Sequence, residues 1–362
     1  MQRRRLLEVG GAGAVAGASL LAAPVIAQER HRWNMVMPWP RNTPGVGVNA
    51  ERFAENVNTM SGGRLTITLY AAGELVPPFE SLDAVQQGAA DLAHGTPYYW
   101  VGKSKALNYF TTIPFGLTAT ELAAWLEFGE GKALWEEVYE PFGVKPFYAG
   151  NSGVQAGGWF KRPIETVDDL QGLKFRIAGL GGEVMRRLGV NVVLLPPGEI
   201  TPALNSGAID AAEWIGPWND RAFGLYRVAN YYYVPAFHEP GPGLEIIVNR
   251  ERYEALSDDL KKIVEVAASA ASHQTLADFT YHNIVSLEPL LAEEGVELHT
   301  FSDEIVRALG EKTKEVLDEL AAVDALTGRV HESFSRFLRQ ATSYNRHFDQ
   351  RLLEMRGMVW PA

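Results

Sequence analysis

The sequence predicts an α/β protein of two lobes, each a sheet flanked by helices, followed by long C-terminal helices. Three observations predict this fold class. Strand-like and helix-like segments alternate in the first part of the chain, the same alternation restarts after Gly150, and the last third has only helical patterns. A chain of 362 residues suits two lobes of ordinary size, and its 46% of hydrophobic residues can supply a normal core.

The first alternation precedes residue 96. An apolar run at 33–37 that a proline ends, and the alternating residues at 65–70, predict two strands. Helical spacing around Phe53 and over 78–87 predicts two helices, and 91–95 is expected to be a short buried strand. This order of elements builds a sheet whose ligands lie at the carboxyl ends of the strands.

The second alternation predicts the second lobe. Strands are expected at 173–177 and at 190–195, where an apolar, β-branched run indicates a buried strand. Helices are expected over 183–188 and 199–205, and residues 209–214 are expected to return to the sheet.

The last third is predicted to form helices over 257–292 and 302–323, and a long final helix that ends near Met355. The final helix carries an apolar stripe at three- and four-residue spacing. Its members are Phe334, Phe337, Leu338, Ala341, Tyr344, Phe348 and Leu352. Two interpretations stay open: the stripe packs on its own lobe, or it packs on a second copy of the protein.

Residues 1–27 have the pattern of an export signal. Arginines at positions 3–5 precede an apolar run of small residues from 9 to 23, and we expect cleavage after Ala27. The arginine cluster fits a twin-arginine signal, and Sec export is the alternative. Because the run is too short and too rich in Gly and Ala for a membrane anchor, we expect the protein to be free in the periplasm.

Charge and composition exclude several classes of function. The formal net charge is −11, and removal of three Arg and one Glu with the signal gives −11 − 2 = −13. An acidic surface argues against a nucleic acid partner, which requires clustered basic residues. The chain has no cysteine, which excludes a disulfide, a zinc–thiolate site and a thiol nucleophile.

Two segments approach catalytic or cofactor motifs without meeting their requirements. The run 150–153 lacks the glycine that a serine-hydrolase elbow needs two places after its serine, because Val154 stands there. The run 179–182 opens a helix after a strand, as a dinucleotide loop does, but Val184 replaces the third glycine. With no HExxH spacing among the histidines either, we expect no enzyme and no organic cofactor.

Several polar residues lie where a ligand is expected. Arg176 is near the carboxyl end of its predicted strand, and its planar guanidinium matches a carboxylate; the alternative is a surface charge. Glu213, followed by Trp214, predicts either a cleft wall or a salt bridge inside the sheet. Asn151 and Gln155 lie where the chain is expected to pass between the lobes, and the alternative for each is a polar loop role.

Blocks of sequence strongly resemble the solute-receptor subunits of TRAP transporters (tripartite ATP-independent periplasmic transporters), in the dicarboxylate-receptor-like family. They include DLQGLKFRI at 169–177, LLPPGEI at 194–200, EWIGPW at 213–218 and HEPG at 238–241. The blocks fall in the right order, and the resemblance covers nearly the whole mature chain. The Glu-Trp pair and the HEPG block resemble the branch that binds 2-oxo and 2-hydroxy monocarboxylates together with a metal cation.

The resemblance implies a periplasmic-binding-protein-like fold with a long helix bridging the lobes. We expect lobe I at 28–152, lobe II at 153–240, a return to lobe I at 241–270, and bridging and C-terminal helices at 271–362. The implied function is a periplasmic receptor that closes around a small 2-oxo or 2-hydroxy acid and delivers it to the membrane permease subunits. A homodimer through the final helix is also implied.

The resemblance further implies roles for individual residues. Arg176 is implied to hold the ligand carboxylate, with Asn151 and Tyr98 completing the pocket. The residues implied to hold the cation, two of which also border the ligand, are Gln155, Glu213, Trp214 (through its backbone carbonyl) and Glu239. These hard oxygen donors suit Na⁺ or Ca²⁺, which would bridge a carboxylate and the bound acid.

Two other functions stay open from the sequence. A periplasmic enzyme acting on a small organic acid would need a nucleophile or a general acid–base pair in the cleft. A receptor that presents its ligand to a membrane sensor kinase would have the same pocket and a different partner. The size of the acid is also open, because Tyr99, Trp218 and Phe237 are aromatic walls that could admit a group larger than that of lactate or pyruvate.

Overall fold

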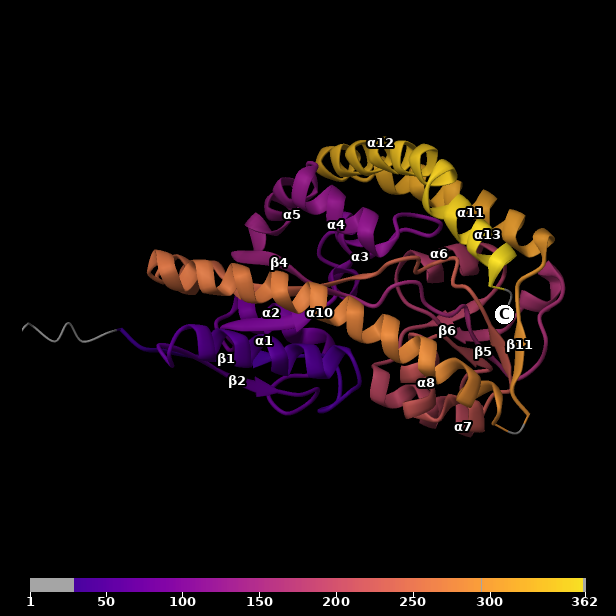
Figure 1. The fold of residues 1–362 in the computed structure, drawn as a ribbon, viewed down its shortest axis with the longest axis horizontal. Helices are drawn as coiled ribbons and strands as arrows, with labels where there is room; N and C mark the ends of the chain where they lie inside the picture. The colour runs from indigo at the N-terminus through magenta and orange to yellow at the C-terminus, as the bar shows by residue number, and fades with distance from the viewer. Residues whose placement is uncertain (1–28, 294, 361–362) are drawn as a thin grey trace, which may run out of the picture.

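The structure is a computed structural model that describes residues 29–293 and 295–360, so the predicted export signal lies outside the described residues. The described chain forms two lobes, each built on one β-sheet, with one long helix running across both (Figure 1). The predicted α/β class with long C-terminal helices is therefore confirmed. Within the described ranges, no helix combines the length and the apolarity that a membrane crossing requires.

Lobe I is built on a five-stranded sheet in the order β2-β1-β3-β10-β4. Strand β1 pairs in parallel with β2 and β3, and β10 pairs antiparallel with β3 and β4. The elements of lobe I are β1 (His31–Val36), α1 (Val46–Met60), β2 (Leu65–Tyr70), α2 (Ser81–Gln86), β3 (Leu92–Gly95), the 3-10 helix η2 (Pro97–Trp100), α3 (Asn108–Thr111), α4 (Ala119–Phe128), α5 (Gly131–Tyr139), β4 (Val144–Asn151), β10 (Gly243–Asn249) and α9 (Arg250–Glu254).

Lobe II is built on a six-stranded sheet in the order β11-β9-β5-β8-β6-β7. Its elements are β5 (Gly158–Phe160), β6 (Lys174–Arg176), α6 (Gly179–Arg187), β7 (Asn191–Val193), α7 (Ile200–Ser206), β8 (Ala211–Ala212), α8 (Pro217–Phe223), β9 (Tyr231–Tyr233) and β11 (Glu297–His299). Strand β6 lies between β8 and β7 and is parallel to both, so its carboxyl end opens at the edge where α/β proteins bind ligands.

The chain crosses between the sheets after β4 and again before β10, and we call these segments the first crossing (152–157) and the second crossing (234–242). The lobe boundaries that we propose, between residues 152 and 153 and between residues 240 and 241, fall within these two segments. Helix α10 (Asp258–Leu291) packs on β4 and α1 in lobe I and on α8 in lobe II, so it bridges the lobes (Figure 1).

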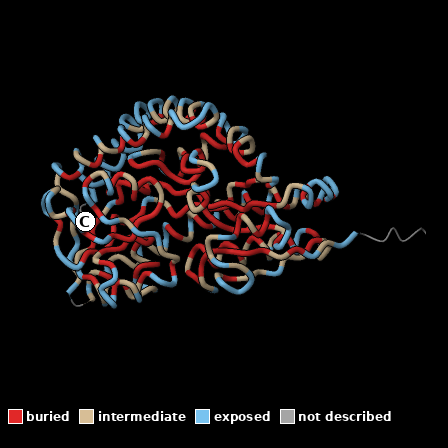
Figure 2. The backbone as a smooth tube through the Cα atoms, turned by 180° about the vertical axis from the view of Figure 1, so that it is seen from behind, coloured by how far each residue is buried: buried red, intermediate tan, exposed pale blue. Residues whose placement is uncertain are grey.

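The C-terminal helices cover one side of both lobes. Helix α11 (Asp303–Ala321) packs on α6 of lobe II, and α12 (Ala325–His347) packs on α3, α4 and α5 of lobe I; α13 (Asp349–Val359) follows. Buried residues follow both sheets and continue through the region where the lobes meet, whereas the outer face of α12 is exposed (Figure 2). The lobe–lobe junction is therefore part of the protein interior in this conformation.

Three local predictions are wrong. The run 190–195 is not a buried strand: β7 is the edge strand of its sheet, and Val193 is exposed, because a β-branched run does not distinguish an edge from a centre. The predicted single final helix is two helices, since Phe348 leaves helical geometry (φ −113°, ψ −86°) and α13 begins after it. Helix α6 also begins earlier than predicted, at Gly179.

The apolar stripe divides between the two interpretations. Phe334 and Ala341 are buried against lobe I, which confirms packing on the protein's own lobe for the first part of the stripe. Tyr344, Phe348 and Leu352 are 56%, 55% and 62% exposed, so the last part has no cover within the described chain.

Candidate ligand and cation site

Arg176 ends strand β6 and is buried, with 1% of its side-chain surface exposed. Its Nη1 donates to Glu213 Oε1 (2.5 Å) and to the Glu213 carbonyl (2.9 Å), and its Nε donates to the Leu195 carbonyl (3.2 Å). The other amino group, Nη2, is buried and has no hydrogen-bond partner in the described chain. Nε and Nη1 of the guanidinium are therefore held by protein acceptors, and Nη2 remains as a donor for a ligand.

Glu213 follows β8 and is held from several directions. Its Oε1 accepts from Arg176 and from the Ala178 backbone N–H (3.0 Å), and its Oε2 lies 3.9 Å from His238 Nε2. Burial alone would raise the pKa of Glu213, but Arg176 and His238 outweigh burial and hold the pKa below its ordinary value. Glu213 thus forms a salt bridge with Arg176, as one of the two interpretations predicts, and this ion pair lies at the carboxyl end of β6.

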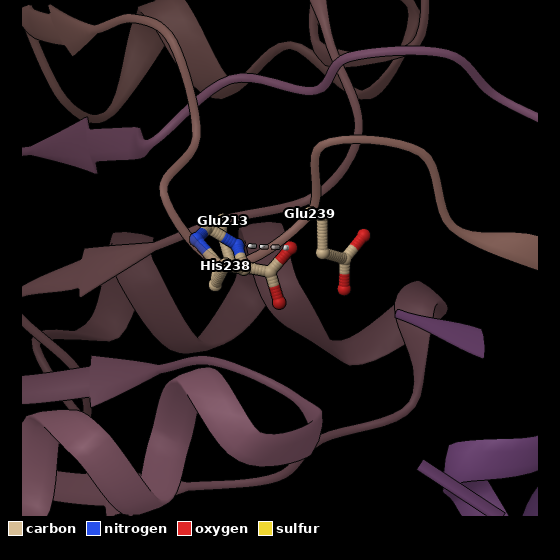
Figure 3. Close-up of side chains that lie close together, drawn as sticks. All are labelled: Glu213, His238 and Glu239. Carbon is tan, nitrogen blue, oxygen red and sulfur yellow. Dashed lines mark ion pairs between the residues drawn. The ribbon is translucent and has the colours of Figure 1, made fainter. Parts of the chain in front are cut away.

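Glu239 is the second buried carboxyl of the site and lies in the second crossing. Glu213, His238 and Glu239 lie close together (Figure 3), and each offers a ligand atom within 4.8 Å of the others. Burial, reinforced by the charge of Glu213, raises the pKa of Glu239 well above its ordinary range. Its Oε1 and both ring nitrogens of His238 have no hydrogen-bond partner among the described residues.

Gln155 comes from the first crossing and completes the polar side of the site. Its backbone N–H donates to the Glu239 carbonyl (3.1 Å), so the two crossings are joined here. Its Nε2 donates to Ser152 Oγ (2.8 Å), which leaves Oε1 buried without a donor. The residues that line the adjoining cavity are Trp39, Val46, Thr96, Tyr98, Tyr99, Ser152, Gln155, Trp214, Ile215, Glu239, Pro242 and Leu244.

The donor set of the site fits a hard cation. Gln155 Oε1 and Glu239 Oε1 are buried acceptors that lack a donor, and Glu213 is a third buried oxygen ligand close to Glu239. Unpartnered buried oxygens are costly, and a bound Na⁺ or Ca²⁺ would satisfy them. The same cation would offset the two carboxyls, which a single guanidinium cannot do.

The structure brings together most of the predicted site residues. Tyr98, Gln155, Trp214 and Glu239 line one cavity, and Arg176 and Glu213 lie next to its lining residues Trp214 and Glu239. Asn151 differs: its Nδ2 donates to the Gly241 carbonyl (2.9 Å) and its Oδ1 accepts from the Gly153 N–H (2.8 Å), so its amide ties the first crossing to the second. A ligand contact from Asn151 stays a prediction.

Sequence reasoning missed His238 as a potential ligand, although it stands in the HEPG block beside Glu239. It also missed the lobe I wall of the cavity at Trp39 and Thr96, for which no local sequence signal exists. Of the three aromatic residues expected as walls, Tyr99 lines the cavity, whereas Trp218 stacks on His282 of α10 and Phe237 contacts Phe115.

The chain is similar to known proteins over most of its length. The family model described as bacterial extracellular solute-binding protein, family 7 (DctP) matches residues 35–324. The monocarboxylate 2-oxoacid-binding periplasmic protein of a Nostoc species is 44% identical over 315 residues, which cover 87% of this chain and 86% of that protein.

Two solved structures of TRAP solute-binding proteins are similar in fold. One from Pseudoalteromonas atlantica with bound sodium and pyruvate has a TM-score of 0.88 and 37% identity, covering 90% of this chain and 99% of that one. One from Bordetella bronchiseptica, a dimer with calcium and picolinate in its site, has a TM-score of 0.89 and 32% identity, covering 91% and 98%. The expected resemblance, and the expectation of a transport receptor and not an enzyme, are confirmed. The chain belongs to the DctP family of bacterial extracellular solute-binding proteins, the receptor subunits of TRAP transporters.

Proposed function

We propose that this protein is a periplasmic receptor that binds a small 2-oxo monocarboxylate, or the corresponding 2-hydroxy acid, together with Na⁺ or Ca²⁺. The observation that carries the proposal is that one buried site contains both a donor that lacks an acceptor and acceptors that lack a donor. Arg176 keeps a donor group without an acceptor, while Gln155 and Glu239 keep oxygens without a donor. An anion and a cation bound side by side would satisfy both.

The acid would be held through its carboxylate by Arg176 Nη2, in a charge-assisted hydrogen bond. Its adjacent 2-oxo or 2-hydroxy oxygen and one carboxylate oxygen can chelate a cation. Oxygens of Gln155, Glu213 and Glu239 and the carbonyl of Trp214 would hold that cation. This arrangement explains why the acid should carry an oxygen next to its carboxylate.

Charge favours joint binding of the acid and the cation. Arg176, Glu213 and Glu239 together carry at most one net negative charge, and a monocarboxylate alone would add a second to a buried site. Burial of uncompensated charge is costly, and a cation between the carboxyls and the acid removes most of that cost. We therefore expect neither ligand to bind well without the other.

The relatives support this choice of ligands. The Nostoc protein is named for 2-oxo monocarboxylates, and the Pseudoalteromonas structure contains sodium and pyruvate. Picolinate in the Bordetella structure is an acid whose carboxylate stands next to a second donor atom, as a 2-oxo acid's does. The ligands of all three proteins are monocarboxylates that can chelate a cation.

The lobe–lobe geometry supports capture by closure. Cavity residues come from lobe I (Trp39, Tyr98), from lobe II (Trp214) and from both crossings (Gln155, Glu239). A ligand that contacts all of them binds the closed form better and shifts the population toward it. The closed receptor would then deliver the acid to the TRAP permease subunits in the membrane.

We also propose that the exposed end of the stripe, Tyr344, Phe348 and Leu352, packs on a second copy of the protein. Phe348→Glu with Leu352→Glu should convert a dimer to a monomer in light-scattering chromatography. Ile284→Glu, at an exposed apolar position on α10, is the matched control and should leave the dimer intact. A wild-type protein that is monomeric at every concentration would contradict this proposal.

A thermal-shift series on unfolded, dialysed and refolded protein tests the ligand class. The series compares 2-oxo acids, 2-hydroxy acids and C4-dicarboxylates, each with Na⁺, with Ca²⁺ and with a chelator. Ligand at a thousand times its Kd adds about 4 kcal/mol, which is a clear shift in Tm. Stabilisation by 2-oxo or 2-hydroxy acids with a cation supports the proposal, and stabilisation by dicarboxylates alone would overturn it.

A further inference from the structure

The segment 213–216 carries Glu213 and Trp214, and its backbone is anchored on both sides of Trp214. The Glu213 N–H donates to the Arg176 carbonyl (3.1 Å), and the Glu213 carbonyl accepts from Arg176 Nη1 (2.9 Å). The Ile215 carbonyl accepts from the Ala156 N–H (2.9 Å). The orientation of the peptide unit between Trp214 and Ile215 is therefore strongly constrained.

Asp220 on α8 is the residue that fixes the N–H side of this peptide unit. Its Oδ1 accepts from the backbone N–H groups of Ile215 and Gly216, each at 3.1 Å. Its Oδ2 accepts from Trp159 Nε1 on β5 at 3.0 Å, and the side chain is fully buried. Asp220 thus connects the site segment to the central strands of the lobe II sheet.

The carbonyl side of the same peptide unit is free. A trans peptide bond is planar, so its C=O and N–H point in opposite directions, and the Trp214–Ile215 bond is trans. Because the N–H of Ile215 points at Asp220, the carbonyl of Trp214 points away from it. None of the hydrogen bonds in the described part of the chain uses this carbonyl, although Trp214 is buried and lines the cavity.

We propose that Asp220 is a positioning residue that directs the Trp214 carbonyl toward the cation. The inference rests on the proposed function, since it assigns a task within the same site. Asp220 itself does not touch the cation or the acid. It acts by holding one end of a rigid peptide unit so that the other end is aligned before the cation arrives, and such supporting groups contribute strongly to metal affinity.

The acceptor role does not depend on the charge of Asp220. Burial raises the pKa of Asp220 to about 7, so the carboxyl exists in both protonation states near neutrality. In either state Oδ1 can accept from two N–H groups while Oδ2 faces Trp159. An amide oxygen in the same place can do the same.

Three variants separate positioning from simple stability. Asp220→Ala removes the acceptor for Ile215 and Gly216, and the cation concentration that half-saturates pyruvate binding should rise by about tenfold or more. Asp220→Asn keeps an oxygen for the two N–H groups, so cation affinity should be retained; its NH₂ faces the N–H of Trp159, donor against donor, so Tm should fall. Trp159→Phe removes the partner of Oδ2 and leaves Oδ1 in place, so it should lower Tm without changing cation affinity.

The outcomes are distinct. Equal cation affinity in Asp220→Ala and the wild type would overturn the inference, and so would an equal loss in Asp220→Ala and Trp159→Phe. Failure of the wild type to bind pyruvate in a cation-dependent way would overturn the proposed function instead, and that result is visible before any variant is made.

A measurement on the wild type covers the case in which Asp220→Ala does not fold. Trp214 is the only tryptophan followed by isoleucine, so ¹³C′-Trp and ¹⁵N-Ile labelling gives one peptide cross-peak for this unit. Adding Na⁺ or Ca²⁺ with pyruvate should shift the ¹³C′ resonance, while the Ile215 amide proton stays protected from exchange. An unmoved carbonyl resonance, or an Ile215 proton that exchanges freely, would contradict the inference.

Discussion

Two buried carboxyl clusters in this protein differ in one respect that separates ligand binding from packing. The cleft cluster consists of Glu213 and Glu239 with Arg176 and His238, and the core cluster of lobe I is centred on Glu245 of β10. In both, burial raises the pKa of a carboxyl, well above the ordinary range at Glu239 and to about 8 at Glu245. Neither burial nor a raised pKa therefore distinguishes them.

The difference lies in hydrogen bonding. Glu245 Oε1 accepts from Trp100 Nε1 (2.7 Å), and both of its oxygens are within 2.9 Å of the Tyr139 hydroxyl, so the core cluster is complete. In the cleft cluster, polar atoms of Arg176, His238 and Glu239 have no partner in the described chain. Between these two clusters, the unsatisfied atoms, and not buried charge as such, distinguish the one that can take a ligand.

The largest effect is expected from Arg176→Ala, which breaks the cleft cluster. The variant leaves the Glu213 carboxylate buried without its guanidinium partner, and it leaves the carboxylate of the acid without a hydrogen-bond donor. We expect binding of pyruvate to weaken by about 100-fold or more, which is about 3 kcal/mol, in titration calorimetry. Arg186→Ala, at an exposed position on α6, is the control and should bind normally. Normal binding by Arg176→Ala would remove Arg176 from the site.

A matched pair of substitutions compares the two clusters directly. Glu239→Gln and Glu245→Gln make the same chemical change at two fully buried carboxyls. Glu239→Gln should lower the apparent affinity for Na⁺ or Ca²⁺ by about 10- to 100-fold, because it removes a charged ligand. Glu245→Gln should leave the cation dependence unchanged. Equal effects of the two would show that the clusters do not differ as described.

The pH dependence of stability should report on the core cluster. The unfolded chain ionises Glu245 near its ordinary value of 4.5, whereas the folded protein keeps the proton up to about 8. Folding therefore becomes less favourable as pH rises through this window, by at most about 1.4 kcal/mol per pH unit from this group. Urea unfolding of Glu245→Gln should show a flatter profile between these pH values than the wild type. Identical profiles would mean that Glu245 is ionised in the folded protein at neutral pH.

The smallest effect on ligand binding is expected from Tyr139→Phe, which removes one hydroxyl from the core cluster. The loss of a buried hydrogen bond to Glu245 should lower the free energy of unfolding by about 1–3 kcal/mol. Binding of pyruvate and cation should not change, since Tyr139 lies on α5 and does not line the cavity. A change in cation affinity would show that the core cluster is coupled to the site.

Much of the fold could be predicted from local patterns. The alternation over β2 and the helical spacing of α1 and α10 identify these elements because one face of each packs on the core. Strand β4 is buried along nearly its whole length and shows no alternation, so its pattern is not diagnostic. The break at Phe348 depends on backbone geometry that no Gly or Pro announces.

The site was less accessible to sequence reasoning alone. Arg176 and Glu213 have local signals at strand ends, but the roles of Gln155 and Glu239 came from the family resemblance. Residues of the two crossings are 84 positions apart and meet only through backbone contacts such as that of Gln155 with Glu239 (155 + 84 = 239). Which polar atoms remain unpartnered, and where Asn151 directs its amide, follows only from the folded geometry.

The most direct test of the central claim is a calorimetric titration of pyruvate into refolded wild-type protein without cations, with Na⁺ and with Ca²⁺. If the unsatisfied donor of Arg176 and the unsatisfied oxygens of Gln155 and Glu239 are filled together, pyruvate should bind at least about tenfold more tightly with a cation than without one. Equal affinity under all three conditions would contradict the account, because the acid would then be bound without the bridging cation.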